Sequence, residues 1–427
     1  LDFDKWANNQ GLENWSYKDC LPYFKSIETS LYRESSLRGQ EGELKVQKAA
    51  CKNPLFEAFF ASVKEAGYNL SDDINAREQE GFSAFDQTIF KGRRLSAARA
   101  FLHKALHRKN LELTTGALVH KILFEKNKAV GVEYSLGRKI IKAYCKEVIL
   151  AAGAINSPQI LQLSGIGDPS LLKQHKIPLT SELKGVGQNL QDHLEVYIQW
   201  RCKKNVSLYP LLNPLRAPKI GFDWLFRKKG PGTSNHFEAG GFIKSNETKA
   251  YPNLQFHFLP LAIKYDGTTP HKGHGFQLHV GPMNTDVRGH VSLRGADPRL
   301  SPKIQFNYLS TEQERREWCE AVRLSRKLIE TKAMDEFKGL EIQPGKEIDS
   351  DEKILDFIAE KGESAYHPSC TCKMGYDEMA VVDKDLLVHT VSGLRVVDAS
   401  VMPSITNANI YAPTLMIAEK ISHKILS

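Results

Sequence analysis

Two side chains near the carboxyl end of the chain are of types that could act together on a proton of a ligand, one as a base and the other as an orienting partner. His367 stands in a Tyr-His-Pro run, and Asn409 stands in a polar loop at 406–411. Imidazole suits a base because its unperturbed pKa lies near neutral. A carboxamide can donate and accept hydrogen bonds at once but cannot compete for the proton. The two residues are therefore a candidate base and orienting partner, provided that folding brings them together.

The neighbouring elements would place this pair beside a helix N-terminus. The apolar run 394–397 is typical of a short buried strand. Pro413 has a preset φ and no amide hydrogen, so it suits the first turn of a helix with Leu415 and Ile417 on its apolar face. Unpaired N–H groups in that turn would favour a ligand oxygen that becomes negative. Taken alone, these residues favour a plainer alternative, a core helix beside a surface histidine.

Capping residues and hydrophobic periodicity predict other elements. Ser16 is expected to begin a helix that runs to Ile27, and Thr311 a helix that runs to about residue 331. Further helices are expected at 53–67, at 94–107, from Ser157 and from Ser350. Strands are expected at 111–113, 119–124, 130–134, 139–150, 254–258, 276–280 and 290–293.

Two glycine-bearing stretches carry a family resemblance. Residues 153–167 (Gly-Ala-Ile-Asn-Ser-Pro-Gln-Ile-Leu-Gln-Leu-Ser-Gly-Ile-Gly) follow an apolar run, and residues 185–193 (Gly-Val-Gly-Gln-Asn-Leu-Gln-Asp-His) come shortly after. Together with the C-terminal segment they resemble the glucose–methanol–choline (GMC) family of flavoprotein oxidoreductases, whose second signature the first stretch fits at every defined position. Motifs at 11–15, 19–24, 255–260, 279–283 and 364–375 extend the resemblance over essentially the whole chain, toward the choline-oxidising branch.

The resemblance implies a mixed α/β (α+β) fold with a Rossmann-like FAD-binding domain and an antiparallel-sheet substrate domain. The expected divisions are a lid or connecting region at 1–84, FAD-binding parts at 85–200 and 364–427, and the substrate domain at 201–363. The sequence lacks the Gly-x-Gly-x-x-Gly turn that lets backbone amides approach the FAD pyrophosphate. We therefore expect an N-terminally truncated fragment that holds FAD poorly. The alternative is a protein that has lost flavin binding.

The resemblance also implies catalytic roles. His367 would accept the hydroxyl proton of an alcohol or stabilise the alkoxide, while FAD would take the hydride. Asn409 matches the position where an Asn or His faces the substrate hydroxyl. Asn407 is a rival nearby that could instead be a turn residue, and a hydrogen-bonded structural role is the alternative for His367.

Contacts with the cofactor are implied for a further set of residues. Ala408 and Thr414 would place backbone or hydroxyl donors toward the pyrimidine edge of the flavin, and Val119 and Asn409 would also contact FAD. Asp398 would contact the cofactor chain between ring and phosphate, unless it is a turn residue at a strand end.

The implied substrate is choline, which would be oxidised to betaine aldehyde. Its trimethylammonium group donates no N–H hydrogen bond, so its binding needs a carboxylate and aromatic faces. Glu238 falls where the choline-oxidising branch has the glutamate linked to the ammonium group, although it could be a solvated carboxylate at a strand end. Phe237 and Tyr366 are candidate aromatic walls. Tyr411 replaces a usual Asn and could narrow the pocket or reach for a flavin oxygen.

Two other histidines are assigned structural roles. His193 ends the 185–193 motif, and His257 lies between two phenylalanines. Because side chains alternate along a strand, His257 lies on the face opposite to these phenylalanines and could face either solvent or the pocket.

Composition bounds the remaining choices. The 427 residues suffice for two or three domains, and a net charge of +8 without a prominent Lys/Arg run does not indicate nucleic-acid binding. A weak basic surface could still face acidic lipid. The seven cysteines are scattered, so no metal site is expected and reduced thiols in an intracellular compartment are the default. The longest apolar run is too short to span a bilayer.

The resemblance, rather than any residue, leads us to expect a membrane quinone as electron acceptor. It likewise implies a location at the mitochondrial inner membrane in an animal, or at the cytoplasmic membrane in a bacterium. Two rival functions stay open, a GMC enzyme for another alcohol or sugar and a flavin-free, non-catalytic relative.

Overall fold

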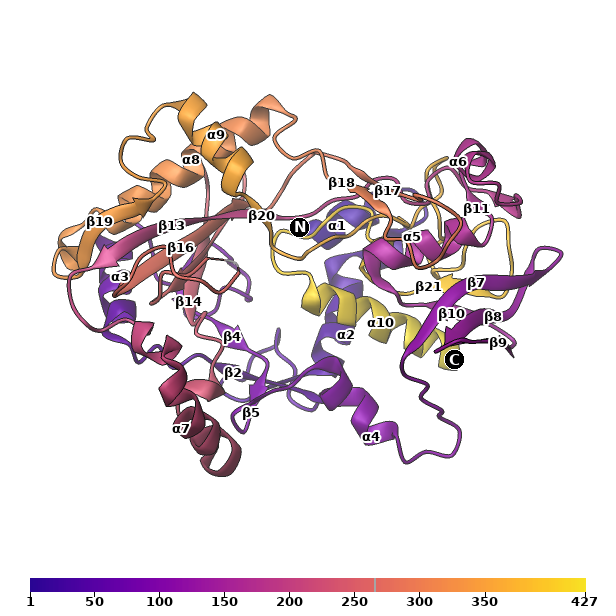
Figure 1. Cartoon of the computed structure of the whole chain (residues 1–427), viewed down its shortest axis with the longest axis horizontal. Helices are drawn as coiled ribbons and strands as arrows, with labels where there is room; N and C mark the ends of the chain where they lie inside the picture. Colours follow the sequence, from indigo (N-terminus) through magenta and orange to yellow (C-terminus); the bar gives the residue numbers. More distant parts are fainter. Residues whose placement is uncertain (265) are drawn as a thin grey trace.

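A seven-stranded antiparallel sheet dominates one lobe of the computed structural model, which describes residues 1–264 and 266–427. The strands run in the order β19-β13-β16-β15-β14-β3, and β20 also pairs with β13 (Figure 1). Their bounds are β3 Gly81–Ala84, β13 Leu194–Cys202, β14 Ala239–Ile243, β15 Leu254–Leu259, β16 Gly275–Pro282, β19 Lys338–Gln343 and β20 Glu363–Ser364.

Three helices cover one face of this sheet. They are α3 (Pro54–Glu65), α8 (Glu312–Ile329) and α9 (Asp351–Lys361), and their apolar faces join alternate strand residues in one core. Each helix begins as its sequence predicts, because the side chains of Asn53, Thr311 and Ser350 accept hydrogen bonds from first-turn amides. The opposite face of the sheet carries polar side chains and faces the other lobe.

The second lobe combines two small sheets with helices (Figure 1). Strands β7 (Ala117–Glu125), β8 (Lys128–Leu136) and β9 (Lys139–Tyr144) form an antiparallel sheet. Strands β10 (Val148–Leu150) and β21 (Leu394–Val396) pair in parallel, although they lie far apart in the sequence. Helix α5 (Gly153–Leu163) follows β10 directly.

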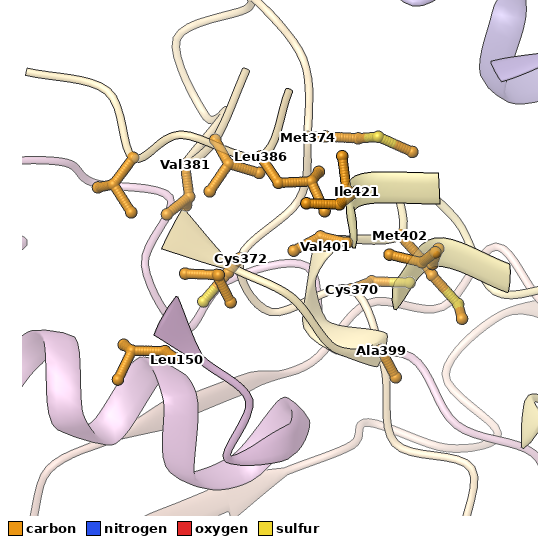
Figure 2. Packing of buried hydrophobic residues seen from close by; sticks show 14 of the residues in the cluster. Leu150, Cys370, Cys372, Met374, Val381, Leu386, Ala399, Val401, Met402 and Ile421 are labelled. Atoms are coloured by element: carbon orange, nitrogen blue, oxygen red, sulfur yellow. The ribbon is translucent and has the colours of Figure 1, made fainter. Parts of the chain in front are cut away.

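Helix α10 (Tyr411–Leu426) ends the chain and packs against α2 (Tyr17–Ile27). Ser16 caps α2 as predicted, since its side chain accepts from the amide of Asp19. The core of this lobe gathers Leu150, Met402 and Ile421 around the thiols of Cys370 and Cys372 (Figure 2). Both thiols are buried, and neither forms a disulfide. Within residues 1–264 and 266–427, no cluster of three or more His, Cys, Asp or Glu side chains could hold a metal ion.

Several predicted elements differ in the structure. The helix expected at 94–107 begins only after β6 (Arg93–Arg94), as a π-helical turn at Ala98–Leu102 followed by α4 (His103–Ala105). The strand expected at 139–150 divides into β9 and β10, which belong to different sheets, and 111–113 forms no strand. Helix α5 begins at Gly153, whose φ of +81° lets the chain turn sharply out of β10.

The sheet includes strands from outside the predicted substrate domain. Strand β13 crosses residue 200 and β3 precedes residue 85, yet both pair within the sheet assigned to 201–363. The expected mixed α/β architecture is confirmed. In the part of the chain that the structure describes, no helix is long and apolar enough to cross a membrane.

The remaining elements are short and connect these parts. The strands are β1 Glu28–Ser30, β2 Leu44–Lys48, β4 Asp86–Gln87, β5 Ile89–Phe90, β11 Ile166–Gly167, β12 Ser181–Glu182, β17 His290–Ser292 and β18 Lys303–Gln305. The helices are α1 Asp2–Ala7, α6 Pro169–Gln174 and α7 Ala217–Phe222, with shorter turns at Glu13–Trp15, Tyr209–Leu212, Pro214–Arg216, Asp223–Arg227, Pro231–Thr233, Lys332–Met334 and Ala399–Val401.

Candidate active site

A cavity of about 650 Å³ lies between the polar face of the seven-stranded sheet and the C-terminal segment. The C-terminal segment contributes Ala365, His367, Ala408, Asn409, Tyr411 and Ala412 to its wall. The sheet side contributes Glu195, Phe237, Phe242, Gln255, His257, His279, Val280, Gly281 and Met283. A cavity of this size that joins apolar surface to a few convergent polar groups is typical of a small-molecule site.

His367 and Asn409 meet in this cavity, as the sequence predicts. The Nδ2 atom of Asn409 lies 3.2 Å from Nε2 of His367, and the Oδ1 atom of Asn409 accepts a hydrogen bond from Nε2 of Gln255 at 3.0 Å. Because an amide nitrogen only donates, Nε2 of His367 must be the acceptor and carry no proton. The basic nitrogen of the imidazole therefore faces the cavity.

His193 supports the other side of the same ring. Its Nδ1 atom lies 2.9 Å from Nδ1 of His367, and its Nε2 atom lies 2.9 Å from the carbonyl oxygen of Met283. The carbonyl can only accept, so Nε2 of His193 donates to it and Nδ1 of His193 accepts from His367. The chain of hydrogen bonds from Gln255 to Met283 thus has one consistent direction, which fixes the tautomer of His367.

Burial keeps both imidazoles neutral. It lowers the pKa of His367 to about 4, against the opposing effect of the Glu195 carboxylate. Burial together with the neighbouring His367 lowers the pKa of His193 to about 3. At neutral pH the pair therefore holds the uncharged form that the hydrogen-bond directions require.

Asp192 holds the backbone that presents His367. Its Oδ1 atom accepts from the His367 amide at 2.9 Å, and its Oδ2 atom accepts from the hydroxyls of Tyr308, at 2.6 Å, and Ser364. The preceding residue, Tyr366, has a φ of +58°. The imidazole is thus oriented both by its ring partners and by an anchored main chain.

The residues expected near the cofactor are placed unequally. Ala408 and Tyr411 line the cavity, and burial raises the pKa of the Tyr411 phenol. The Thr414 hydroxyl donates to the carbonyl of Ile410 at 2.7 Å within α10. Val119 lies on β7 and packs against the core of the second lobe rather than lining the cavity.

Asp398 does not have a carboxylate free for a cofactor, contrary to expectation. Its Oδ2 atom accepts from the amide of Gly153 at 2.9 Å and from the hydroxyl of Ser157 at 2.5 Å. Its Oδ1 atom accepts from the amide and hydroxyl of Ser400. Both oxygens already have donors, so Asp398 joins the start of α5 to the turn after β21.

Glu238 faces a different, smaller cavity of about 410 Å³. Its Oε2 atom accepts from the amide of Cys51 at 2.8 Å, and its Oε1 atom accepts from the hydroxyl of Ser234 at 2.6 Å. These bonds hold the carboxylate away from the main cavity. The sequence led us to expect Glu238 in the same site as His367, and the structure does not bring the two together. Of the two expected aromatic walls, Phe237 lines the main cavity, whereas Tyr366 is 69% exposed and does not.

Sequence reasoning missed the polar face of the sheet. Glu195, His257 and His279 line the cavity, and His193 contacts the candidate base, although His193 and His257 were expected to be structural. The alternation of apolar and polar residues along β13 was the signal that could have predicted this polar face. The rival Asn407 instead donates to the carbonyl of Pro252 at 2.7 Å, which makes it a structural loop residue.

Family models identify the class of protein. Models of the GMC oxidoreductases match residues 1–195 with their N-terminal part and residues 285–418 with their C-terminal part. The chain belongs to the GMC oxidoreductase family.

The chain is similar to an oxygen-dependent choline dehydrogenase of Staphylococcus saprophyticus, with 50% identity over 98% of this chain and 76% of that protein. Among solved structures, it is similar to a pyridoxine 4-oxidase from Mesorbium loti, with a TM-score of 0.88, 28% identity, and coverage of 99% of this chain and 80% of the other. An FAD-dependent oxidoreductase from Chaetomium thermophilum also has a TM-score of 0.88, at 25% identity, with 99% and 82% coverage.

Proposed function

We propose that this protein oxidises choline to betaine aldehyde. Membership of the GMC family makes it an oxidoreductase whose cofactor is FAD. The half-identical relative is named for choline oxidation, and the cavity holds a neutral base of the kind that alcohol oxidation needs. The observation that carries the proposal is the contact of Asn409 with Nε2 of His367 at the cavity wall.

The residues divide the work in a defined way. Nε2 of His367 takes the hydroxyl proton of the alcohol, and Nδ2 of Asn409 donates a hydrogen bond to the oxygen from which that proton leaves. His193 accepts from Nδ1 of His367 and so stabilises the imidazole as its positive charge develops. FAD, when bound, supplies the acceptor for the hydride of the alcohol carbon. Loss of the proton and the hydride turns the alcohol into the aldehyde.

The carboxyl ends of β10 and β21 fit the cofactor, because ligands of parallel α/β sheets bind at that edge. Ala151 and Ala152 are exposed just after β10, and a Cβ added to Gly153 would meet no atom within 4 Å. In the cavity, the buried Oε1 atom of Gln255 has no hydrogen-bond partner within the described residues and could accept one from a ligand. We propose that Ala408, Asn409 and the first turn of α10, including Thr414, face the flavin.

The proposal is tested by the absorbance of the FAD-loaded protein in the absence of oxygen. Choline should bleach the oxidised flavin spectrum, with one equivalent of betaine aldehyde formed. Bleaching by a neutral alcohol or by pyridoxine but not by choline would assign the protein to another substrate of the family. An unbleached spectrum with every alcohol would contradict the proposal, and a protein that cannot be loaded with FAD would support the flavin-free, non-catalytic alternative.

Oxygen is the electron acceptor that we propose. A membrane quinone was expected from the family resemblance, but the staphylococcal relative is named oxygen-dependent. Oxygen consumption during choline turnover, measured against reduction of a soluble quinone analogue, distinguishes the two. Consumption of oxygen at the rate of aldehyde formation supports oxygen, and turnover only with the quinone contradicts it. The same relative is bacterial, so a mitochondrial location has no support.

Peripheral contact with an anionic membrane is a further proposal, carried by α7 and the turn after it. Leu215 and Phe226 are 87% and 73% exposed, and Phe222 and Leu225 are also exposed at helical spacing beside them. Residues 214–229 contain five basic side chains and one acidic side chain. A basic segment with an outward apolar face is suited to the surface of acidic lipid.

Vesicle flotation tests this contact. The protein should float with phosphatidylglycerol vesicles and not with phosphatidylcholine vesicles. The paired change Leu215→Ser and Phe226→Ser should abolish flotation, whereas Leu340→Ser, at a 64% exposed leucine on β19, should not. A parent protein that does not float would contradict membrane contact. So would a Leu215→Ser and Phe226→Ser variant that still floats and differs only in its oligomeric state.

A further inference from the structure

Gln255 stands on the cavity side of β15, between side chains that belong to the core. Phe256 and Phe258 are buried in the core that the sheet shares with α3, α8 and α9. Because side chains alternate along a strand, Gln255 points to the opposite face, where it lines the main cavity. One hydrogen bond joins it to the carboxamide of Asn409. The sheet therefore places an uncharged polar group beside the orienting partner of the candidate base.

The carboxamide of Gln255 is bonded on one side only. Its Nε2 atom donates to Oδ1 of Asn409 at 3.0 Å, whereas its Oε1 atom is buried without a hydrogen-bond partner in the described part of the chain. The residue as a whole is 3% exposed. A buried polar atom without a partner costs free energy that an apolar side chain of the same length would avoid. Packing therefore does not account for a glutamine here, which directs attention to its hydrogen bond with Asn409.

The orientation of the Asn409 carboxamide decides what it offers to the base. With Nδ2 toward Nε2 of His367, the amide donates and the imidazole accepts. A carboxamide rotated by half a turn would present Oδ1 to the same nitrogen, and two acceptors would then face each other. Asn409 is exposed on its loop, and among the described residues Gln255 is the side chain that donates to Oδ1. This donation favours the orientation in which Nδ2 faces His367.

The other end of this chain of hydrogen bonds is fixed by the main chain. His193 donates through Nε2 to the carbonyl of Met283, which cannot donate in return. The direction of the bond between His193 and His367 follows from that contact, and so do the tautomers of both rings. Gln255 does not set the tautomers. What depends on Gln255 is the orientation of the amide between it and His367.

We propose that Gln255 is a positioning residue for the oxidation, and that it acts through Asn409. It holds Nδ2 of Asn409 toward Nε2 of His367 and toward the alcohol oxygen from which the proton leaves. The inference rests on the proposed function, in which Asn409 donates to that oxygen. Gln255 itself transfers no proton. Its loss should therefore weaken the reaction only as far as Asn409 contributes to it.

The test is a double-mutant cycle in the FAD-loaded protein. Gln255→Met keeps the length of the side chain and removes its donor, and it should lower kcat/KM for choline by about 3- to 10-fold. The loss should appear chiefly in kcat, because the alcohol oxygen becomes negative only as the reaction proceeds. In the Asn409→Ala background the same change should alter kcat/KM by no more than about twofold, since no amide is left to orient. Losses that multiply in the double variant would overturn the inference.

Gln199 supplies the matched control on the same sheet. It is also a buried glutamine whose Oε1 atom lacks a partner within the described residues. Its Nε2 atom donates to the carbonyl of Ile263 at 2.9 Å and to Oε1 of Gln277 at 2.7 Å, and so it does not contact Asn409. Gln199→Met should leave kcat/KM within about twofold of the parent. A loss as large as that of Gln255→Met would show a general effect of buried glutamines and would contradict the inference.

Nitrogen NMR of the histidine-labelled protein supplies a readout that needs no turnover. In Gln255→Met the ring of His367 should keep its tautomer, while its Nε2 signal should move toward that of a nitrogen without a hydrogen-bond donor. Gln199→Met should leave the signal in place. An unmoved Nε2 signal in folded Gln255→Met would overturn the inference, and Gln255→Leu replaces that variant if it does not fold. A parent protein that oxidises no alcohol would instead refute the proposed function, and the NMR comparison would still decide the role of Gln255.

Discussion

Two cavities of this protein each contain one glutamate, and the two carboxylates are placed for different work. In the smaller cavity Glu238 accepts from the amide of Cys51 and the hydroxyl of Ser234, so its oxygens join a loop to the segment before β14. In the main cavity Glu195 contacts His279 and faces the space reached by His367. One carboxylate serves the fold and the other is open to a ligand.

The comparison teaches that a motif position does not settle what a side chain does. Glu238 stands where a family motif predicts the ammonium-binding glutamate, yet its hydrogen bonds are already made inside the protein. Glu195 belongs to no motif that predicted a role, yet the alternation of β13 directs it into the cavity. The partners that a buried polar group has already bonded decide whether it can bind anything else.

The largest expected difference between the cavities concerns their histidines. His367→Asn removes the base of the main cavity and should lower kcat for choline by about 10² to 10⁴-fold. His236→Asn is the matched change in the smaller cavity, at a φ of +65° that Asn tolerates. It should leave kcat within threefold. Equal losses in the two variants would remove the distinction between the cavities.

Acid should lower the free energy of unfolding of the protein in a defined pH window, because of three histidines in and beside the main cavity. Burial lowers the pKa values of His193, His257 and His367 to about 3, 4 and 4. In the unfolded chain they return to about 6.5, so the unfolded state binds more protons between pH 6.5 and 4. Stability is full above pH 6.5 and falls as the pH drops through this window.

Urea unfolding at pH 7 and pH 5 measures this loss, which should be roughly 2 to 6 kcal/mol. His257→Gln, which removes one of the three groups without touching the base, should reduce the difference between the two pH values. An unchanged unfolding free energy between pH 7 and pH 5 would show that these imidazoles are not held neutral.

A smaller effect is expected at the carboxamide. Asn409→Ala removes the donor to Nε2 of His367 and should lower kcat/KM for choline by about tenfold, the value of one hydrogen bond to a developing charge. Asn407→Ala is the control on the same loop and should affect stability more than kcat/KM, since Asn407 bonds to the carbonyl of Pro252. The reverse result would exchange the roles of the two residues.

The smallest effect belongs to the structural glutamate. Glu238→Gln removes the negative charge that strengthens the hydrogen bonds donated by the Cys51 amide and the Ser234 hydroxyl, and only one of the two polar atoms of the new side chain can accept. The free energy of unfolding should fall by about 1 to 2 kcal/mol, measured by urea titration. Unaltered stability combined with weaker choline binding would return Glu238 to the role that its motif suggested.

Local signals predicted much of the fold. The caps at Ser16, Asn53, Thr311 and Ser350 each mark a helix start, because side-chain acceptors next to unpaired first-turn amides leave a clear pattern. The prediction of a regular helix at 94–107 was wrong in part, because hydrophobic periodicity does not distinguish a regular helix from the π-helical turn that forms there. Pairing between β10 and β21 joins distant segments and has no local signature.

The site was predictable at its centre and not at its walls. A motif links His367 and Asn409 to one chemistry, and the structure brings them together. The supporting contact with His193 depends on how β13 meets the C-terminal segment, and the orientation of Glu238 depends on the Cys51 loop. Such relations arise from tertiary packing, so spacing along the chain does not contain them.

The account rests on His367 presenting an unprotonated Nε2 atom to the cavity. Nitrogen NMR of the histidine-labelled protein at pH 7 measures this directly, with His367→Asn used to assign the signals. We predict a neutral ring that is protonated at Nδ1, toward His193, and unprotonated at Nε2. A ring protonated at Nε2, or at both nitrogens, would contradict the account.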